Sequence, residues 1–579
     1  MKLEKEIRER VNEWLEGPYD AETKAALEQL IAEEKSEEIS DAFYKSLEFG
    51  TGGLRGVMGV GTNRINKYTL GAATQGLSNY LQQQYPGENI KVVIAHDNRN
   101  NAEKFAQIVA DVFSANGIKV YFFEGLRPTP ELSFAIRYLK AHSGVMLTAS
   151  HNPKEYSGYK AYWTDGGQVV APHDKNIIEQ VNLITDVEKI KFKRNDELVE
   201  YIGEEVDSAF IESVLKASVY PNAITENRDL CMVFSPIHGA AVEMVPRALK
   251  TAGFTNLHLV EEQCIPDGNF PTVIYPNPEE EEAMSMTIKK AMLVDAELAM
   301  ASDPDGDRVG VAVKKPEGDY VLLNGNQTCT LLFHYVMQGW KNLGKLKGRE
   351  YIVKTIVTTY LIDKIADSFG ITCHNTLTGF KFIGATMTQL EDSSQFITGG
   401  EESYGYLVGD HVRDKDAVVS CLLIAEMAAW YRSRGKSLYE ALQDIYLEYG
   451  LYREKLISFT KAGKEGAEKI SRMMRELRAN PPATINGEEV ELVRDYLSGE
   501  EHHIPSGKKK KLNFPSSNVL QFITPSGQRV SARPSGTEPK IKFYISVNAP
   551  LNLRGEYEAM CAALDRDIES IAGELGMGG

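Results

Sequence analysis

The feature that most constrains the fold is a pattern of two apolar runs that occurs three times along the chain. Each occurrence opens with a short run rich in β-branched residues: "IKVVIAHDNR" at 90, "LCMVFSPIHG" at 230 and "YIVKTIVTT" at 351. Each closes on a second run that ends in polar residues: "GVMLTASHNP", "ELAMASDPDGDR" and "QFITGGEESYG". Such runs are typical of buried parallel strands, and amphipathic stretches between them suit crossover helices. We therefore predict three similar α/β domains with mixed sheets.

The length of the chain and its last quarter complete the predicted organisation. A chain of 579 residues is too long for one hydrophobic core, so several domains are expected. After about residue 455 the sequence changes to a helix, hairpin-like segments around "NGEEVELV", a long β-rich stretch and a closing helix. This order is typical of an α+β domain with an antiparallel sheet. The predicted segments are an N-terminal helical collar at 1–45 within the first domain, three α/β domains at 46–205, 206–324 and 325–452, and an α+β domain at 453–579.

Charge and composition exclude several classes of protein. A net charge of −17 argues against nucleic acid as the main partner, although one cleft that gathers Arg and Lys could hold a small anion. The sequence has no signal-peptide core and no run of 18 apolar residues. Its six cysteines are scattered, with no CxxC pair, as in reduced cytoplasmic proteins. We expect a cytoplasmic protein with no nucleic-acid, membrane or obligatory protein partner. The basic "GKKKKL" of 507–512 could be an anion patch, but it lies between turn signals, so we expect a solvated loop there.

Ser150, His151 and Asn152 stand side by side and are residue types of a covalent hydrolase. The nucleophile elbow of acyl hydrolases is G-x-S-x-G, but Thr148 and Asn152 occupy the two glycine positions. His151 is adjacent in sequence, so we expect its ring to point away from Ser150 and not to serve as the base for it. The fragment argues against an acyl hydrolase. It leaves open an ordinary polar loop before Pro153 or a serine with another task.

The segment "DPDGDR" predicts a metal site. Asp303, Asp305 and Asp307 alternate between two apolar runs, and three carboxylates this close repel one another unless a cation neutralises them. An EF-hand is excluded, because Gly306 falls at loop position 4 and Lys314 at position 12, where that loop requires Gly at 6 and Glu at 12. An all-oxygen site with few protein ligands suits Mg²⁺.

Two further polar segments have residue types that could bind a sugar phosphate. In "RPSGTEPKIKFY", Arg533 offers a fork for phosphate oxygens, Ser535 and Thr537 add hydroxyls, and Gly536 lets backbone N–H groups approach an anion. In "GGEESYG", Glu401 and Ser403 could bind vicinal hydroxyls, or the acidic residues could mark a helix N-terminus. The glycine-rich "GTGGLRG" at 50–56 and the "GKS" at 435–437 lack residues of the dinucleotide fingerprint and of the P-loop, so neither predicts a nucleotide enzyme.

The serine loop, aspartate triplet, Glu-x-Ser loop and phosphate segment follow the order seen in the α-D-phosphohexomutases, and the chain resembles that family from "FGTGGLRGVMGVGTNRIN" at 49 onward. The resemblance implies four domains around a central cleft and a phosphoserine that exchanges a phosphoryl group with hexose phosphates. It implies Mg²⁺ and a glucose 1,6-bisphosphate intermediate. The Tyr404-Gly405-Tyr406 sequence and the chain length are closest to the longer phosphoglucomutase branch. Glucose 1-phosphate and glucose 6-phosphate are therefore the first choice of substrate, and mannose or pentose phosphates the alternatives.

The resemblance also implies a role for each candidate residue. Ser150 resembles the phosphorylated nucleophile and, with the three aspartates, a metal ligand; Lys160 in "SGYK" resembles the acid/base lysine, whose pKa should be lowered. Other positions resemble catalytic, anion-binding and substrate-binding residues: Arg55, His151, Arg308, Gly379, Lys381, Glu401, Ser403, Arg533, Ser535, Gly536 and Thr537. A magnesium-dependent sugar phosphatase and a non-catalytic sugar-phosphate binding protein remain as alternatives from other classes.

Overall fold

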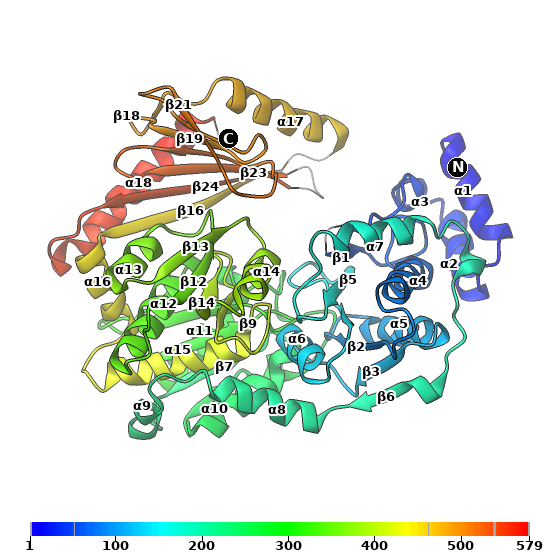
Figure 1. Cartoon of the computed structure of the whole chain (residues 1–579), viewed down its shortest axis with the longest axis horizontal. Helices are drawn as coiled ribbons and strands as arrows, with labels where there is room; N and C mark the ends of the chain where they lie inside the picture. The colour runs from blue at the N-terminus through cyan, green and yellow to red at the C-terminus, as the bar shows by residue number, and fades with distance from the viewer. Residues whose placement is uncertain (1–2, 51, 461–462, 536–539, 577–579) are drawn as a thin grey trace. The chain divides into compact units, whose positions relative to one another are not determined.

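The computed structural model describes residues 3–50, 52–460, 463–535 and 540–576 (Figure 1). The chain forms two compact units. The first unit contains 1–325 and 380–435, and the second contains 326–379 and 436–579. Within the described residues, none of the helices combines the length and hydrophobicity that a membrane crossing requires.

The first unit begins with the predicted helices of the N-terminal collar. These are α1 (Lys5–Glu16), α2 (Ala21–Ala32) and α3 (Ser36–Phe43). Their apolar side chains form one cluster. In this cluster the Trp14 and Phe43 rings are edge-on, with their centres 5.5 Å apart. Asp20 caps α2 by accepting a hydrogen bond from the backbone N–H of Thr23 at 2.9 Å.

The first sheet of this unit is mixed, with strand order β1-β5-β4-β2-β3-β6. β2, β3, β4 and β6 are parallel, whereas β5 runs antiparallel to β4, and β1 to β5. Apolar side chains of the strands and the flanking helices fill its core. The elements are β1 (Gly53–Val57), α4 (Lys67–Gln84), β2 (Lys91–His96), α5 (Ala102–Ala115), β3 (Lys119–Phe123), α6 (Thr129–Tyr138), β4 (Ser143–Leu147), β5 (Tyr156–Trp163), α7 (His173–Asn182) and β6 (Val199–Ile202).

The second sheet repeats this plan with strand order β11-β10-β9-β7-β8. β7 is parallel to β8 and β9, and β10 returns antiparallel to β9, so the loop between β9 and β10 is a tight hairpin at the carboxyl end of β9. The elements are α8 (Glu204–Leu215), α9 (Pro221–Glu226), β7 (Met232–Ser235), α10 (Met244–Ala252), β8 (Leu257–Leu259), α11 (Glu281–Val294), β9 (Leu298–Ser302), β10 (Val309–Lys314) and β11 (Tyr320–Leu323).

The third α/β region is divided between the two units. Its later part belongs to the first unit: α14 (Phe380–Leu390), the antiparallel pair β14 (Gln395–Gly400) and β15 (Tyr406–Val408), and α15 (Ala417–Arg432). Its earlier part, with α16, belongs to the second unit: most of α12 (Gly325–Asn342), the parallel pair β12 (Glu350–Thr355) and β13 (Thr372–Thr376), α13 (Leu361–Phe369) and α16 (Leu438–Tyr449).

The remainder of the second unit has the predicted α+β character. All adjacent strands of its seven-stranded sheet, β16-β24-β23-β22-β19-β20-β21, are antiparallel. The elements are β16 (Leu451–Thr460), α17 (Gly463–Ala479), the hairpin β17 (Thr484–Ile485) and β18 (Glu488–Glu489), β19 (Leu492–Asp495), β20 (Glu500–His503), β21 (Lys508–Lys511), β22 (Leu520–Ile523), β23 (Arg529–Pro534), β24 (Lys540–Ala549) and α18 (Tyr557–Glu574).

The expected solvated loop at "GKKKKL" is wrong. Lys508–Lys511 form the edge strand β21, whose backbone pairs with β20. All four side chains are exposed, as an edge strand requires if it is not to pair with other chains. Consecutive lysines concealed the strand, because a strand with no buried face has no apolar alternation to detect.

Candidate active site

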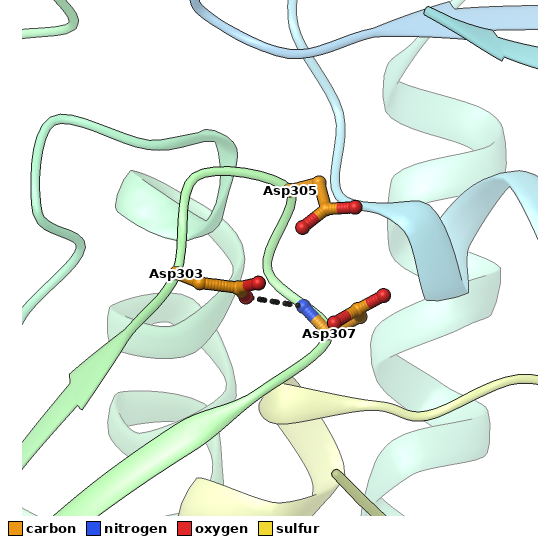
Figure 2. A group of neighbouring side chains, drawn as sticks. All are labelled: Asp303, Asp305 and Asp307. Carbon is orange, nitrogen blue, oxygen red and sulfur yellow. Dashed lines mark hydrogen bonds between the residues drawn. The ribbon is translucent and has the colours of Figure 1, made fainter. Parts of the chain in front are cut away.

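Three buried aspartates occupy the hairpin loop between β9 and β10. Asp303, Asp305 and Asp307 converge there, and each offers a carboxylate oxygen within 4.8 Å of the others (Figure 2). The backbone N–H of Asp307 donates to Asp303 Oδ1 at 3.1 Å, which closes the loop on itself. Gly306 permits the turn, because its φ is +66° and an added Cβ would lie 2.7 Å from the Pro128 Cβ.

The charge distribution of the loop suits a cation. Burial, reinforced by the neighbouring Asp305 and Asp307, holds the pKa of Asp303 well above its ordinary value. Burial acts in the same direction on Asp305, but the Lys160 ammonium outweighs it and lowers the pKa of Asp305. Among the described residues, Asp305 Oδ1 and Asp307 Oδ1 are buried and accept no hydrogen bond. Buried carboxylate oxygens with unused lone pairs are ligands for a hard divalent ion, so these three residues could hold a metal.

Ser150 lies beside this loop, directly after β4. Its Oγ donates a hydrogen bond to Asp303 Oδ2 at 3.0 Å. The prediction that the His151 ring points elsewhere is wrong, because Nδ1 of His151 lies 3.2 Å from Ser150 Oγ. The left-handed backbone of Ser150, with φ +52°, explains this, since it turns the chain sharply between the two side chains.

The Ser150 loop is fixed by a residue that the sequence did not reveal. Arg99 is buried, and its guanidinium donates to the carbonyls of Ser150 at 2.6 Å, Pro153 at 2.8 Å and Tyr156 at 3.0 Å, and to that of Asn152. One side chain thereby holds the strained turn in place. Nothing in the local sequence near Arg99 could have indicated this contact, because the two segments are about 50 residues apart.

Two lysines neutralise part of the acidic loop. Lys160 Nζ, on β5, lies 2.6 Å from Asp305 Oδ2 and 3.5 Å from Asp307 Oδ2. Lys415 Nζ lies 3.0 Å from Asp307 Oδ2 and 3.3 Å from Asp414 Oδ1. Lys415 was not among the predicted residues, although it lies in "VRDKD" at 412–416, a run of alternating charges a few residues after Ser403.

The expected lowering of the Lys160 pKa is wrong in this structure. Burial alone would lower the pKa of Lys160, but the attraction of Asp305 and Asp307 exceeds that effect and raises it. The same reasoning holds for Lys415, whose pKa is raised by Asp307 and Asp414 against the effect of burial. Both lysines are therefore ammonium ions beside the carboxylates.

The Glu-x-Ser segment also approaches the aspartate loop. It is the loop between β14 and β15, and the Tyr404 carbonyl accepts a hydrogen bond from the backbone N–H of Val309, directly after the aspartates, at 3.0 Å. Glu401 is buried in this loop and Ser403 is half-buried. The interpretation of the segment as a helix N-terminus is wrong, because the next helix, α15, begins only at Ala417.

Three other predicted residues of the first unit have different surroundings. Arg55, on β1, donates to Asn152 Oδ1 at 3.2 Å, so it lies against the Ser150 loop. Arg308 forms an ion pair with Glu279 at 2.8 Å, and the pKa of Arg308 is raised because Glu279 and Asp307 outweigh burial. Lys381 lies in the first turn of α14, where burial lowers its pKa.

The predicted phosphate segment belongs to the second unit. Arg533 lies near the end of β23, opposite Lys542 of β24, and the Ser535 backbone N–H donates to the Lys540 carbonyl at 2.7 Å. Gly536 and Thr537 lie outside the described residues. Gly379, also in this unit, has a φ of +113°, a conformation suited to glycine.

Comparison with known proteins identifies the family. The chain matches three successive α/β/α domains of phosphoglucomutase/phosphomannomutase: domain I over 46–188, domain II over 208–318 and domain III over 324–449. The chain belongs to the phosphoglucomutase/phosphomannomutase family, whose members are mutases, a class of isomerase. The resemblance to the α-D-phosphohexomutases is therefore confirmed.

Curated relatives match nearly the whole chain. The phosphoglucomutase of Staphylococcus haemolyticus is 34% identical over 92% of this chain and 93% of its own length. That of Staphylococcus aureus strain USA300 is 36% identical over 93% of this chain and 95% of its own length. Among solved structures, parafusin, a phosphoglucomutase of Paramecium, covers 92% of this chain and 96% of its own with a TM-score of 0.67 and 19% identity. A phosphoglucomutase/phosphomannomutase family protein of Burkholderia thailandensis covers 92% and 98% with a TM-score of 0.64 and 19% identity.

Proposed function

We propose that the protein interconverts glucose 1-phosphate and glucose 6-phosphate through a phosphorylated Ser150. The observation that carries this proposal is the 3.0 Å hydrogen bond from Ser150 Oγ to Asp303, within a loop that could hold a divalent ion. The choice of glucose is supported by relatives that are 34–36% identical over most of the chain and are named phosphoglucomutase. Mannose and pentose phosphates are the alternative substrates of the same reaction.

The chemistry would proceed in two transfers. The P–O bond to Ser150 Oγ breaks as a sugar hydroxyl oxygen bonds to the phosphorus, and the departing Ser150 oxygen takes up a proton. The hydroxyl proton of the sugar passes to a basic group of the site. Lys160 is the candidate for this group, and its ammonium form must first release a proton to solvent before it can accept another. The product is glucose 1,6-bisphosphate, which turns around and returns its other phosphate to Ser150. Asp303, Asp305 and Asp307 would hold Mg²⁺, which neutralises charge on the phosphoryl oxygens when it is bound.

The other candidate residues would bind the substrate. Glu401 and Ser403 would bind sugar hydroxyls, and Arg55, Arg308 and Lys381 would contact phosphate oxygens. Gly379 would belong to the same binding segment as Lys381. The phosphate that does not react would be held by a clamp of four residues of the second unit, namely Arg533, Ser535, Gly536 and Thr537. One clamp that holds either phosphate explains how a single site serves both orientations of the sugar.

The domain boundaries and the location in the cell are part of the same proposal. Domains at 46–205, 206–324, 325–452 and 453–579 would each bring one polar segment to the reaction. A cytoplasmic location is supported by the six cysteines, none of which forms a disulfide in the described structure. Hexose phosphates would be the partners, and no protein partner is needed for the chemistry.

Phosphorus NMR tests the proposal directly. Purified protein with Mg²⁺ and a trace of glucose 1,6-bisphosphate is given glucose 1-phosphate, mannose 1-phosphate or ribose 1-phosphate in separate samples. We expect the glucose 1-phosphate resonance to convert to that of the 6-phosphate with no free phosphate. Accumulation of inorganic phosphate would instead establish a sugar phosphatase, and binding without conversion of any substrate would establish a binding protein.

A further inference from the structure

A cavity with charged and apolar walls lies entirely within the second unit. Its volume is about 830 Å³, and its walls come from α13, β13, β16, β19, β20, β21, β22 and the turn at 525–527. That turn precedes β23, whereas the predicted phosphate clamp at Arg533 and Ser535 follows it. Since a strand rises about 3.3 Å per residue, the two ends of β23 are about 17 Å apart. The cavity is therefore distinct from the clamp.

The cavity has an excess of positive charge in a strongly acidic protein. Its lining includes Lys364, Arg494, Lys510 and Lys511, and the carboxylates Asp363, Asp367 and Glu501. Two of these carboxylates are already paired: Lys354 lies 3.0 Å from Asp363, and Arg494 lies 2.7 Å from Glu501. Among the described residues, the three lining lysines form no ion pair, and Asp367 is the one lining carboxylate without an ion pair, so the unpaired charge of the lining is positive on balance.

More positive charge lies behind the wall at Tyr360. Arg529 is buried, with its guanidinium 4.0 Å from the centre of the Tyr360 ring, and Lys354 Nζ is 5.1 Å from the same centre. Arg494 donates to the Tyr360 hydroxyl at 2.8 Å. These cations outweigh the effect of burial and lower the pKa of Tyr360. The potential on this side of the cavity therefore favours an anion.

The remaining walls are flat and apolar. Tyr360 and Phe514 are partly exposed, and the Phe514 ring lies edge-on to Tyr496 at 5.2 Å. The apolar part of the lining is completed by Ile356, Tyr452, Leu492, Leu512, Ile523 and Pro525. A sugar would need many polar partners for its hydroxyls, whereas a flat ring needs few. The combination suits an anion that carries an aromatic ring.

We propose that this cavity binds a nucleotide, with its base against the aromatic walls and its phosphates at Lys510 and Lys511 of β21. The volume is within the range of small-molecule sites, and the last two lysines of β21 line the cavity. The exposed lysines of β21 have no part in the proposed reaction. Nucleotide binding would give a function to two of them, Lys510 and Lys511. The proposal does not depend on the mutase activity.

Calorimetric titration of the full chain tests this site. Magnesium adenosine and uridine triphosphates are the probes, and saturating glucose 1,6-bisphosphate blocks the reaction site. The Lys510→Ala/Lys511→Ala variant should bind about tenfold more weakly, as the loss of two charge-assisted contacts predicts. The matched control is Lys508→Ala/Lys509→Ala on the same strand, outside the cavity lining, which should bind as the native protein does.

Three results would overturn the proposal. One is nucleotide binding that glucose 1,6-bisphosphate abolishes, because the nucleotide would then occupy the reaction site. Another is equal loss of affinity in the two double variants, since the effect would then be general surface charge. The third is inorganic triphosphate binding as tightly as the nucleotide, which would exclude a role for the aromatic walls. Both double variants should still convert glucose 1-phosphate. This control would show that the substitutions leave the proposed reaction intact.

Discussion

The aspartate loop of the first unit and the cavity of the second unit have an excess of charge of opposite sign. In the loop, three buried carboxylates lie within 4.8 Å of one another, and Lys160 and Lys415 neutralise only part of their charge. In the cavity, lysines and arginines exceed the carboxylates, and Arg529 lies buried behind the wall. Burying a charge is costly unless a partner compensates it. Each region is therefore preorganised for a ligand of the opposite sign.

The two regions differ in how their buried cations are held. Lys415 has two carboxylates within 3.3 Å. Arg529 has no carboxylate within ion-pair distance among the described residues, and its guanidinium donates instead to the carbonyls of Ile356, Val357 and Thr358 at 2.9 to 3.2 Å. The nearby Glu454 is half-buried, and burial raises its pKa despite Arg529. Removal of each cation should therefore have a different cost.

The largest effect is expected at Ser150, because we propose that Ser150 and the aspartate loop form a reaction site and not only an ion site. Ser150→Ala should lower turnover of glucose 1-phosphate about 10⁴-fold or more, because the group that carries the phosphoryl is lost. Ser143→Ala is the matched control, since Ser143 is a buried serine at the other end of β4 whose hydroxyl bonds to the Tyr162 carbonyl. Activity assays and intact mass measure turnover and phosphorylation. Near-native turnover of Ser150→Ala would refute the mechanism.

The next effect concerns the ion itself. Asp305→Asn should weaken Mg²⁺ binding about 100-fold, because it removes a carboxylate oxygen that has no other partner. Bound at a hundred times its dissociation constant, an ion stabilises the native state by about 2.7 kcal/mol, so thermal unfolding with and without Mg²⁺ reports the difference. Asp295→Asn, an exposed aspartate paired with Lys314, should respond to Mg²⁺ as the native protein does. If Mg²⁺ stabilised Asp305→Asn as much as it stabilises the native protein, the ion would bind elsewhere.

Removal of Lys415 should leave the buried Asp414 without an ion pair among the described residues, and should leave Asp307 with only the more distant Lys160 and Arg308, at 3.5 and 3.8 Å. Lys415→Met is therefore expected to reduce the free energy of unfolding of the metal-free protein by about 3–5 kcal/mol. Lys314→Met removes a lysine from an exposed pair and should cost less than about 1 kcal/mol. Urea unfolding without metal measures both. If the two variants lose the same stability, Lys415 is not the compensating charge.

The fold and most of the candidate site were predictable because their signals are local. The apolar runs around Val93, Val233 and Val353 form buried strands. The three aspartates that alternate after the apolar run of β9 form one cluster, as the sequence predicted. The α+β pattern after 455 was also confirmed by the antiparallel sheet. In each case, the residues that carried the signal are neighbours in sequence.

The features that escaped prediction depend on contacts between distant segments. Arg99 holds a loop about 50 residues away, and Lys415 reaches Asp307 across more than 100 residues. The requirement for glycine at position 405 is visible only in the packing, because an added Cβ would lie 2.1 Å from the Lys415 side chain. The raised pKa of Lys160 likewise results from carboxylates on another sheet. Periodicity and local motifs carry no information about such pairs.

The smallest effect is expected at Arg529, where the comparison between the two buried cations is most direct. Arg529→Met removes a buried charge without leaving an unpaired carboxylate within ion-pair distance, but three carbonyls lose their donor. We expect a loss of about 2 kcal/mol in the free energy of unfolding, which is less than for Lys415→Met. Urea unfolding of the two variants in one buffer gives the order, and Mg²⁺ affinity should stay native in Arg529→Met. A loss equal to that of Lys415→Met would mean that carbonyl dipoles compensate a buried cation as strongly as carboxylates do, and the proposed contrast between the two regions would fail.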